Sequence, residues 1–109
     1  MFLRPKKDIH MGLDAFRRAQ AMAPGGAVLL DVRTPGERKL GYLPGSVNLP
    51  LNQLKSAGKV IPDFDTPVFI YCANGARAQR AAKRLMRAGY KNVMSIGGLE
   101  GYRGEILKG

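Results

Sequence analysis

The chain has 109 residues, of which 45% are hydrophobic, and this size and composition are typical of one globular domain with its own core. No stretch approaches the ~18 apolar residues of a membrane helix, and the N-terminal residues lack the apolar region of a secretory signal. Eighteen Lys and Arg against eight Asp and Glu give a formal charge of +10, which favours anionic ligands or acidic partners.

The first part of the chain begins with a polar segment and then alternates between helix and strand patterns. Residues 1–8 form a predicted polar lead-in, and residues 9–109 form the predicted domain. Within the domain, the pattern predicts a brief edge strand over residues 9–11, a helix over residues 14–22 and a strand over residues 28–32. The apolar residues of the last segment run almost continuously, which predicts a central parallel strand covered on both faces.

Two charged side chains follow this strand at its C-terminal end, where open α/β sheets place their ligands. Asp31 is a candidate site residue or a fastener of the next loop, because a carboxylate there can accept backbone N–H bonds. Arg33 either faces the substrate or forms a salt bridge that organises the rim of the candidate site. Thr34 and Glu37 match a capping box, which predicts a short helix that ends at Gly41.

The second part of the chain continues the alternation and contains no repeat or linker. Alternating strands and helices with apolar strands predict an α/β fold around a parallel sheet. The predicted elements of residues 43–71 are, in order, a turn and very short strand within residues 43–50, one helical turn from Leu51 to Leu54, a surface connection over 55–67 and a strand over 68–71. The loop at residues 72–77 is followed by a predicted helix whose apolar face runs from Ala78 to Gly89, a strand over 93–96 and a helix over 99–107.

The segment Cys72 to Arg77, CANGAR, contains the only cysteine and joins a predicted strand to a predicted helix. The first free N–H groups of that helix and its positive dipole end point toward the sulfur, which favours thiolate over thiol. Gly75 allows a tight turn whose N–H groups converge on an anion, and Arg77 adds a positive charge. We predict an activated cysteine in an anion cradle. A lone thiol suits a reducing compartment, so we expect a cytoplasmic protein.

The positive charge is concentrated around this loop. No acidic residue occurs between Asp65 and Glu100. The same window holds six cations, which either form a solvated helix face or attract an anionic substrate or an acidic partner. They are Arg77, Arg80, Lys83, Arg84, Arg87 and Lys91.

Four motifs in register resemble the single-domain rhodanese-like proteins, the thiosulfate sulfurtransferase family. The resemblance implies one rhodanese-like domain with a central parallel sheet of about five short strands and helices on both faces. The chain differs from the usual family pattern at Tyr42, Ala78 and Tyr102. The four motifs are DVRTPGE at residues 31–37, GYLPGSVNLP at 41–50, CANGAR at 72–77 and RLMRAGYKNVMSIGGLEGYRG at 84–104.

The resemblance also implies roles for individual residues. Cys72 is the expected nucleophile that carries sulfur, and Asp31 and Arg33 match the pair beside the site. A thiosulfate-like anion donates sulfane sulfur to form a persulfide, and cyanide, a thiol or a partner protein then accepts it. The expected substrate-binding residues of the loop are Ala73, Asn74, Gly75, Ala76 and Arg77.

Other functions are less compatible with the sequence. Cysteine phosphatases and arsenate reductases of related fold resemble a pattern with five residues between Cys and Arg, whereas four lie between Cys72 and Arg77. A non-catalytic module that binds an acidic protein or RNA is a second alternative, although the basic segment lacks interleaved aromatic residues for base stacking. With one cysteine and with His10 as the only histidine, we predict no metal site and no cofactor.

Overall fold

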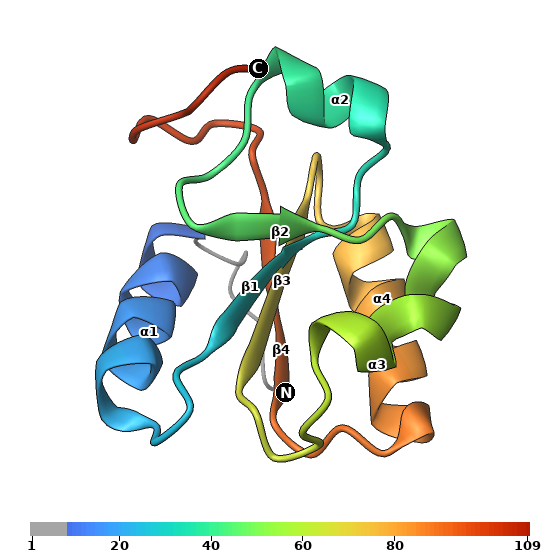
Figure 1. Cartoon of the computed structure of the whole chain (residues 1–109). Coiled ribbons are helices and arrows are strands. Elements are labelled where there is room, and N and C mark those ends of the chain that lie inside the picture. Colours follow the sequence, from blue (N-terminus) through green and yellow to red (C-terminus); the bar gives the residue numbers. More distant parts are fainter. Residues whose placement is uncertain (1–8) are drawn as a thin grey trace, which may run out of the picture.

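In the part of the chain that the structure describes, four parallel strands form a single sheet in the order β2-β1-β3-β4 (Figure 1). The computed structural model describes residues 9–109, so the predicted lead-in of residues 1–8 lies outside the described residues. The sheet confirms the predicted α/β class. Its strands are β1 (Val28–Asp31), β2 (Ser46–Asn48), β3 (Val68–Cys72) and β4 (Val93–Gly98).

Helices cover both faces of the sheet, as expected for parallel strands (Figure 1). Helix α1 (Ile9–Met22) covers one face. The short 3₁₀ helix η1 (Leu51–Ser56), α3 (Ala57–Val60) and α4 (Ala76–Ala88) cover the other face. Helix α2 (Pro35–Leu40) lies beyond the C-terminal ends of the strands (Figure 1).

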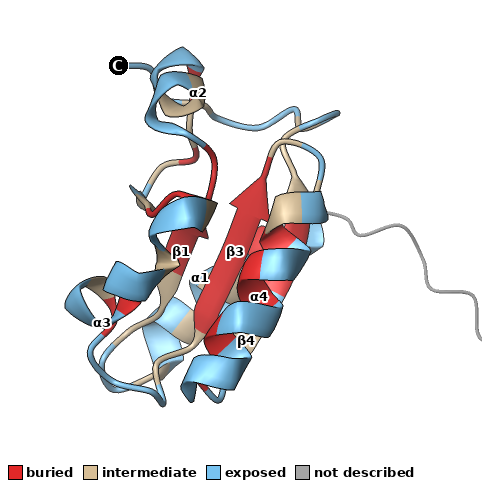
Figure 2. Cartoon of the chain, turned by 90° about the vertical axis from the view of Figure 1, so that its right-hand side faces the viewer, coloured by how far each residue is buried: buried red, intermediate tan, exposed pale blue. Residues whose placement is uncertain are grey.

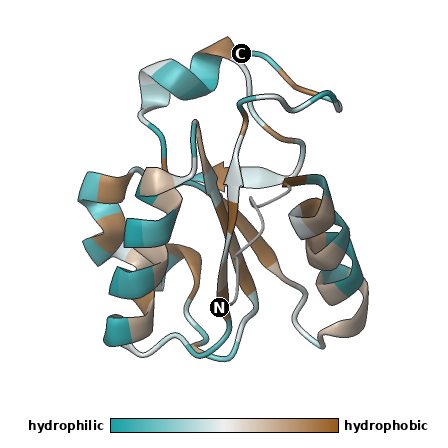
Figure 3. Cartoon of the chain, turned by 180° about the vertical axis from the view of Figure 1, so that it is seen from behind, coloured by the Kyte–Doolittle hydropathy of each residue, from teal (hydrophilic) through white to brown (hydrophobic). Residues whose placement is uncertain are grey.

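Strand β3 lies between β1 and β4, and all five of its residues are buried (Figure 2). Because side chains alternate along a strand, Tyr71 joins the apolar cluster beneath α1, whereas Ile70 and Cys72 join the cluster beneath α4. Figure 3 shows the hydrophobic strands at the centre of the molecule and hydrophilic stretches on the surrounding helices. The cysteine therefore ends the most deeply buried strand, on the face that α4 covers.

Several local signals in the sequence are confirmed. The Thr34 side chain accepts a bond from the Glu37 amide, and the Glu37 carboxylate accepts one from the Thr34 amide, so the capping box that starts α2 is present. Gly41 ends this helix. Gly89 adopts a left-handed conformation with φ of 116° and ends α4.

The predicted edge strand over residues 9–11 is wrong, because α1 begins at Ile9. Ile9 and Leu13 are one helical turn apart and are both buried against the sheet. Gly12 lies between them, directly against Ile96, where an added Cβ would overlap the Ile96 side chain. The described residues therefore contain four strands where about five were expected.

The predicted C-terminal helix over residues 99–107 is also wrong. Gly101 has φ of 79°, which interrupts a right-handed helix, and the segment ends in an isolated antiparallel bridge between Leu107 and Tyr42. The predicted surface connection over residues 55–67 contains α3, whose Ala57 is buried. Residues 99–107 contain two glycines and α3 has four residues, so the local pattern of each segment is weak and tertiary contacts decide its conformation.

Candidate active site

The loop after β3 turns the chain sharply into α4. Gly75 precedes the helix with φ of 98°, a left-handed conformation that residues with a Cβ rarely adopt. The loop lies at the C-terminal edge of the sheet, where parallel α/β sheets place their ligands. The glycine therefore allows α4 to start after a connection of only three residues, 73–75.

The sulfur of Cys72 accepts hydrogen bonds from two backbone amides. The Gly75 N–H donates to Sγ at 2.9 Å, and the Ala78 N–H in the first turn of α4 donates at 3.4 Å. The cysteine side chain is buried against the core face of α4. Two backbone N–H donors therefore converge on the sulfur at the N-terminal end of α4, and activation of the thiol stays a prediction.

Three further amides belong to the same loop. Among the residues that the structure describes, the N–H groups of Ala73, Asn74 and Arg77 have no hydrogen-bond acceptor. The Asn74 side chain accepts a bond from the Ala76 N–H at 3.1 Å, which holds the turn. The loop therefore keeps N–H donors beyond the two that hold the sulfur, and such donors bind anions.

Arg77 forms a two-point ion pair with Glu37 of α2. Its Nη1 and Nη2 atoms lie 2.7 and 2.8 Å from Oε1 and Oε2. Hydrogen bonds from Arg77 outweigh the opposing effect of burial and lower the pKa of Glu37 to about 2. The positive charge predicted for the cradle is present, but it is shared with a carboxylate. A substrate contact by Arg77 stays a prediction.

Asp31 and Arg33 lie together in the interior beside the loop. Arg33 donates from Nε and Nη2 to the two Asp31 oxygens at 3.0 and 2.8 Å, and its amide also donates to Asp31. Nη2 reaches the Gly41 carbonyl as well, at 2.6 Å. Burial opposes the charge on Arg33, but the bonds and charge of Asp31 outweigh it, so the pKa of Arg33 is raised. This geometry favours loop-fastening roles for both residues. Substrate binding by Arg33 stays a prediction.

The network around Asp31 includes residues that sequence reasoning missed. The Tyr71 hydroxyl donates to Asp31 Oδ2 at 3.0 Å and accepts from the Leu43 amide. Arg38 of α2 donates to the same carboxylate oxygen at 3.3 Å. Burial raises the pKa of Tyr71, which keeps the phenol protonated as a donor. In the sequence, Tyr71 is a tyrosine at the end of an apolar strand, and this position does not indicate a hydrogen bond to Asp31.

Strand β4 approaches the cysteine loop very closely. The Leu99 amide donates to the Cys72 carbonyl at 3.0 Å, and the Glu100 amide donates to the Ala73 carbonyl at 3.0 Å. A Cβ at Gly98 would overlap the backbone of Ala73 and Asn74. Gly98 is therefore a further site residue that the sequence reading missed, although the pair Gly97–Gly98 after an apolar strand is a signal for close backbone approach.

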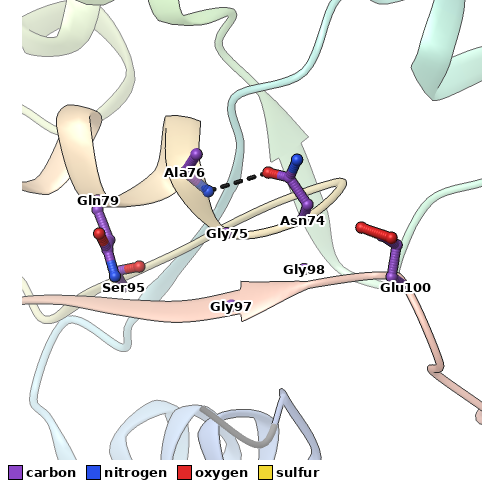
Figure 4. Close-up of a pocket in the computed structure, with 8 residues that line it drawn as sticks. All are labelled: Asn74, Gly75, Ala76, Gln79, Ser95, Gly97, Gly98 and Glu100. Carbon is purple, nitrogen blue, oxygen red and sulfur yellow. Dashed lines mark hydrogen bonds between the residues drawn. The ribbon is translucent and has the colours of Figure 1, made fainter. Parts of the chain in front are cut away.

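A hollow of about 440 Å³ lies beside the loop, on its β4 side (Figure 4). It is open to solvent and mixes polar and small residues, so it suits a small polar molecule better than a large apolar one. Cys72 and Arg77 are not among its lining residues. Those residues are Asn74, Gly75, Ala76, Gln79, Ser95, Gly97, Gly98 and Glu100.

His10 stacks on the ring of Tyr102, with 4.9 Å between the ring centroids. Both residues line a separate cavity beside α1.

Residues 9–109 contain no group of three or more His, Cys, Asp and Glu side chains placed to hold a metal ion. Among residues 9–109, no helix has the length and apolar character needed to cross a membrane.

Comparison with known proteins gives concordant matches. Residues 17–105 match the family model of the rhodanese-like domain. Uncharacterized protein YqhL of Bacillus subtilis is 40% identical over 81 residues, or 73% of this chain and 64% of YqhL, so the chain spans less than two thirds of that relative. Thiosulfate sulfurtransferase GlpE of Pseudomonas syringae is 36% identical over 87 residues, or 79% of this chain and 81% of GlpE. A solved E. coli rhodanese with anions has a TM-score of 0.72 and 29% identity, covering 77% of this chain and 100% of that one.

Proposed function

We propose a reaction for this chain, which belongs to the rhodanese-like family: it transfers sulfane sulfur from an anionic donor to a nucleophilic acceptor through Cys72. Relatives named as thiosulfate sulfurtransferases support sulfur transfer as the kind of activity. The lone thiol of the reaction suits a reducing compartment such as the cytoplasm. Thiosulfate is the donor that we choose for assay.

In the first half-reaction, the Cys72 thiolate attacks the outer sulfur of thiosulfate. A new S–S bond forms to Sγ, the S–S bond of thiosulfate breaks, and sulfite leaves with the bonding electron pair. The product is a Cys72 persulfide that carries the negative charge on its outer sulfur. No external oxidant or reductant is needed, because the sulfur atom is transferred to Sγ at the same oxidation level at which the donor held it.

In the second half-reaction, a nucleophile such as cyanide, a small thiol or a partner's cysteine attacks the outer sulfur. The S–S bond of the persulfide breaks and the electron pair returns to Sγ, which restores the thiolate. The free N–H groups of Ala73, Asn74 and Arg77 are suited to stabilise the leaving sulfite and the outer sulfur, as the donors of an oxyanion hole do.

The observation that carries this proposal is the pair of amide donors on the sulfur, from Gly75 at 2.9 Å and Ala78 at 3.4 Å. A cysteine that served only as core filler would need no such donors. The cradle also serves a persulfide anion, because its donors belong to the backbone and do not have to release a proton.

Steady-state kinetics with thiosulfate and cyanide test the proposal. The native chain should produce thiocyanate and sulfite with the parallel double-reciprocal lines of a ping-pong mechanism. Cys72→Ala should reduce thiocyanate production to background while the chain stays folded by circular dichroism. Production that survives in folded Cys72→Ala would remove the cysteine from the mechanism. A native protein that is inactive with thiosulfate, polysulfide and thiosulfonate donors would favour the non-catalytic alternative.

A further inference from the structure

The sheet face that bears Cys72 is covered by helices with cations and no acids. Helices η1, α3 and α4 contain no Asp or Glu. The exposed cations on these helices are the basic face of the molecule, and none of them forms an ion pair among residues 9–109. The basic face consists of Lys55, Lys59, Arg80, Lys83, Arg84 and Arg87.

The basic face starts at the active-site loop. Arg80 and Arg84 follow Arg77 at spacings of three and four residues, so the three side chains share one side of α4. At about 1.5 Å of rise per residue, Arg84 lies roughly 12 Å along α4 from the loop. Figure 2 shows α4 with its buried residues toward the sheet and its exposed residues outward along the same length.

An apolar groove runs beside this row of arginines, between η1 and α4. Its volume is about 380 Å³. Arg84 crosses it toward η1, where Nη1 lies 3.5 Å from the Leu51 carbonyl. An apolar floor with a cationic rim matches the common pattern of a protein interface, with an apolar centre and a charged edge. The groove is lined by Leu51, Asn52, Leu54, Lys55, Arg84, Leu85 and Ala88.

We propose that this groove and the basic face dock an acidic protein that exchanges sulfur with Cys72. The docking segment presents carboxylates to Arg80, Arg84 and Lys55 and inserts one aliphatic side chain between Leu54 and Leu85. A typical interface covers about 800 Å² on each partner and so extends well beyond the ~12 Å between groove and loop. The same partner therefore reaches the mouth of the cysteine loop with its own thiol.

The charge of the groove alone would also attract nucleic acid, but the residues between the charges favour protein. No aromatic side chain occurs in η1, α3 or α4, so the face offers no platform on which bases stack. The groove floor is aliphatic instead, and burial of a partner's Leu or Ile there would remove apolar surface from water. The identity of the partner as a sulfur donor or acceptor rests on the proposed function.

Binding is tested with a fluorescein-labelled helical peptide that carries Glu on one face and Leu at its centre. The double variant Arg80→Glu and Arg84→Glu should weaken binding by about tenfold or more at low ionic strength, because the reversed charges repel the peptide. The matched control reverses Arg18 and Arg103, which are exposed and lie outside η1, α3 and α4. This control should stay within about twofold of the native Kd. Equal weakening in both double variants would overturn the proposal.

The groove has its own test. Ala88→Gln fills the groove without a charge change and should weaken binding of the peptide. Met86→Gln, on the side of α4 toward β4, should leave peptide binding unchanged. A peptide with Ser in place of the central Leu should bind more weakly. Equal binding of the Leu and Ser peptides would overturn the groove assignment. Tighter binding of oligouridine than of the acidic peptide, lost in Arg80→Glu with Arg84→Glu, would assign the face to RNA instead.

A second readout links docking to chemistry. The same peptide with a terminal cysteine should take sulfur from the persulfide form faster than a matched peptide with Gln for Glu, and equal rates would contradict the partner assignment. Peptide binding itself requires no sulfur chemistry. A chain that binds the peptide but accepts no sulfur from donors would refute the proposed function and support the docking surface.

Discussion

At the level of single residues, the environment of Cys72 is built from backbone more than from side chains. The two donors on Sγ are amides. Gly98 lets the end of β4 come close enough for the Leu99 and Glu100 amides that follow it to bond the carbonyls of Cys72 and Ala73. The geometry of the sulfur site therefore depends on glycines that carry no functional group.

Gly98→Ala should disturb this geometry. The added Cβ would overlap the backbone of Ala73 and Asn74, which cannot rotate away as a side chain can. We expect a loss of about 1 to 3 kcal/mol in the free energy of unfolding and a lower rate of sulfur transfer. Urea unfolding and thiocyanate production measure the two effects. Gly58→Ala is the control, because nothing lies within 4 Å of its added Cβ. Native-like stability and rate in Gly98→Ala would show that the close approach is dispensable.

Asp31 has a different task, since it holds a buried cluster in place. Asp31→Asn keeps the size of the side chain but leaves the buried Arg33 without its counter-charge. We expect a loss of about 3 to 5 kcal/mol in the free energy of unfolding, measured by urea titration. Asp14→Asn removes an exposed pair with Arg17 and should cost less than about 1 kcal/mol. A similar small cost at both positions would contradict the structural role of Asp31.

The residues of the loop were predictable from the sequence, whereas their partners were not. Cys72, Gly75 and Arg77 occupy a strand-to-helix junction, and local pattern identifies such a junction. The pairs Glu37 with Arg77 and Asp31 with Tyr71 each join residues that are 40 positions apart. Only the order of strands in the sheet brings them together, and no local signal encodes that order.

At the level of elements, one ion pair connects α2 to the start of α4. Glu37 already belongs to the capping box of α2, so its carboxylate serves Thr34 and Arg77 together. Because Arg77 lies at the end of the loop, in the first turn of α4, the pair limits movement of α2 relative to the cysteine cradle. We therefore assign Arg77 a positioning role in addition to its charge.

The pH dependence of stability should reveal this connection. The pKa of Glu37 falls from 4.5 to about 2 in the folded chain. A lowered pKa stabilises the fold above about 4.5, and this contribution disappears as the pH falls toward about 2. Glu37→Gln should cost about 1 kcal/mol near neutral pH, since the pair is partly exposed, and the difference from the native chain should shrink across that window.

Urea unfolding of both proteins between neutral and acidic pH measures this difference. Glu105→Gln is the control, because Glu105 is exposed and forms no ion pair among the described residues. A difference between Glu37→Gln and the native chain that stays constant down to the lowest pH would contradict the assignment.

The elements that sequence pattern predicted well have strong local signals. The capping box predicted α2, the apolar runs predicted β1 and β3, and Gly89 predicted the end of α4. The wrong predictions fall on segments whose conformation is decided by tertiary contacts. The first turn of α1 is fixed by packing of Ile9 and Gly12 against the sheet. Residues 99–102 instead form a turn closed by a bond from the Tyr102 amide to the Leu99 carbonyl, and Leu107 bridges to Tyr42.

For the whole molecule, the sheet order brings its functional parts to one edge. The C-terminal ends of β1 and β3 are neighbours, so the Asp31 cluster and the Cys72 loop lie side by side with α2 above them (Figure 1). The basic face extends from this edge along α4. The proposed sulfur transfer needs a site for a small anionic donor and a surface for an acidic partner, and this arrangement places the two proposed sites next to each other.

The most direct test of the central claim is the intact mass of the protein after incubation with thiosulfate. We predict a gain equal to one sulfur atom on the native chain, lost again on addition of cyanide and absent in Cys72→Ala. The released sulfite should match the amount of modified protein. A folded native chain whose mass does not change with thiosulfate, or a sulfur adduct that persists in Cys72→Ala, would contradict the account.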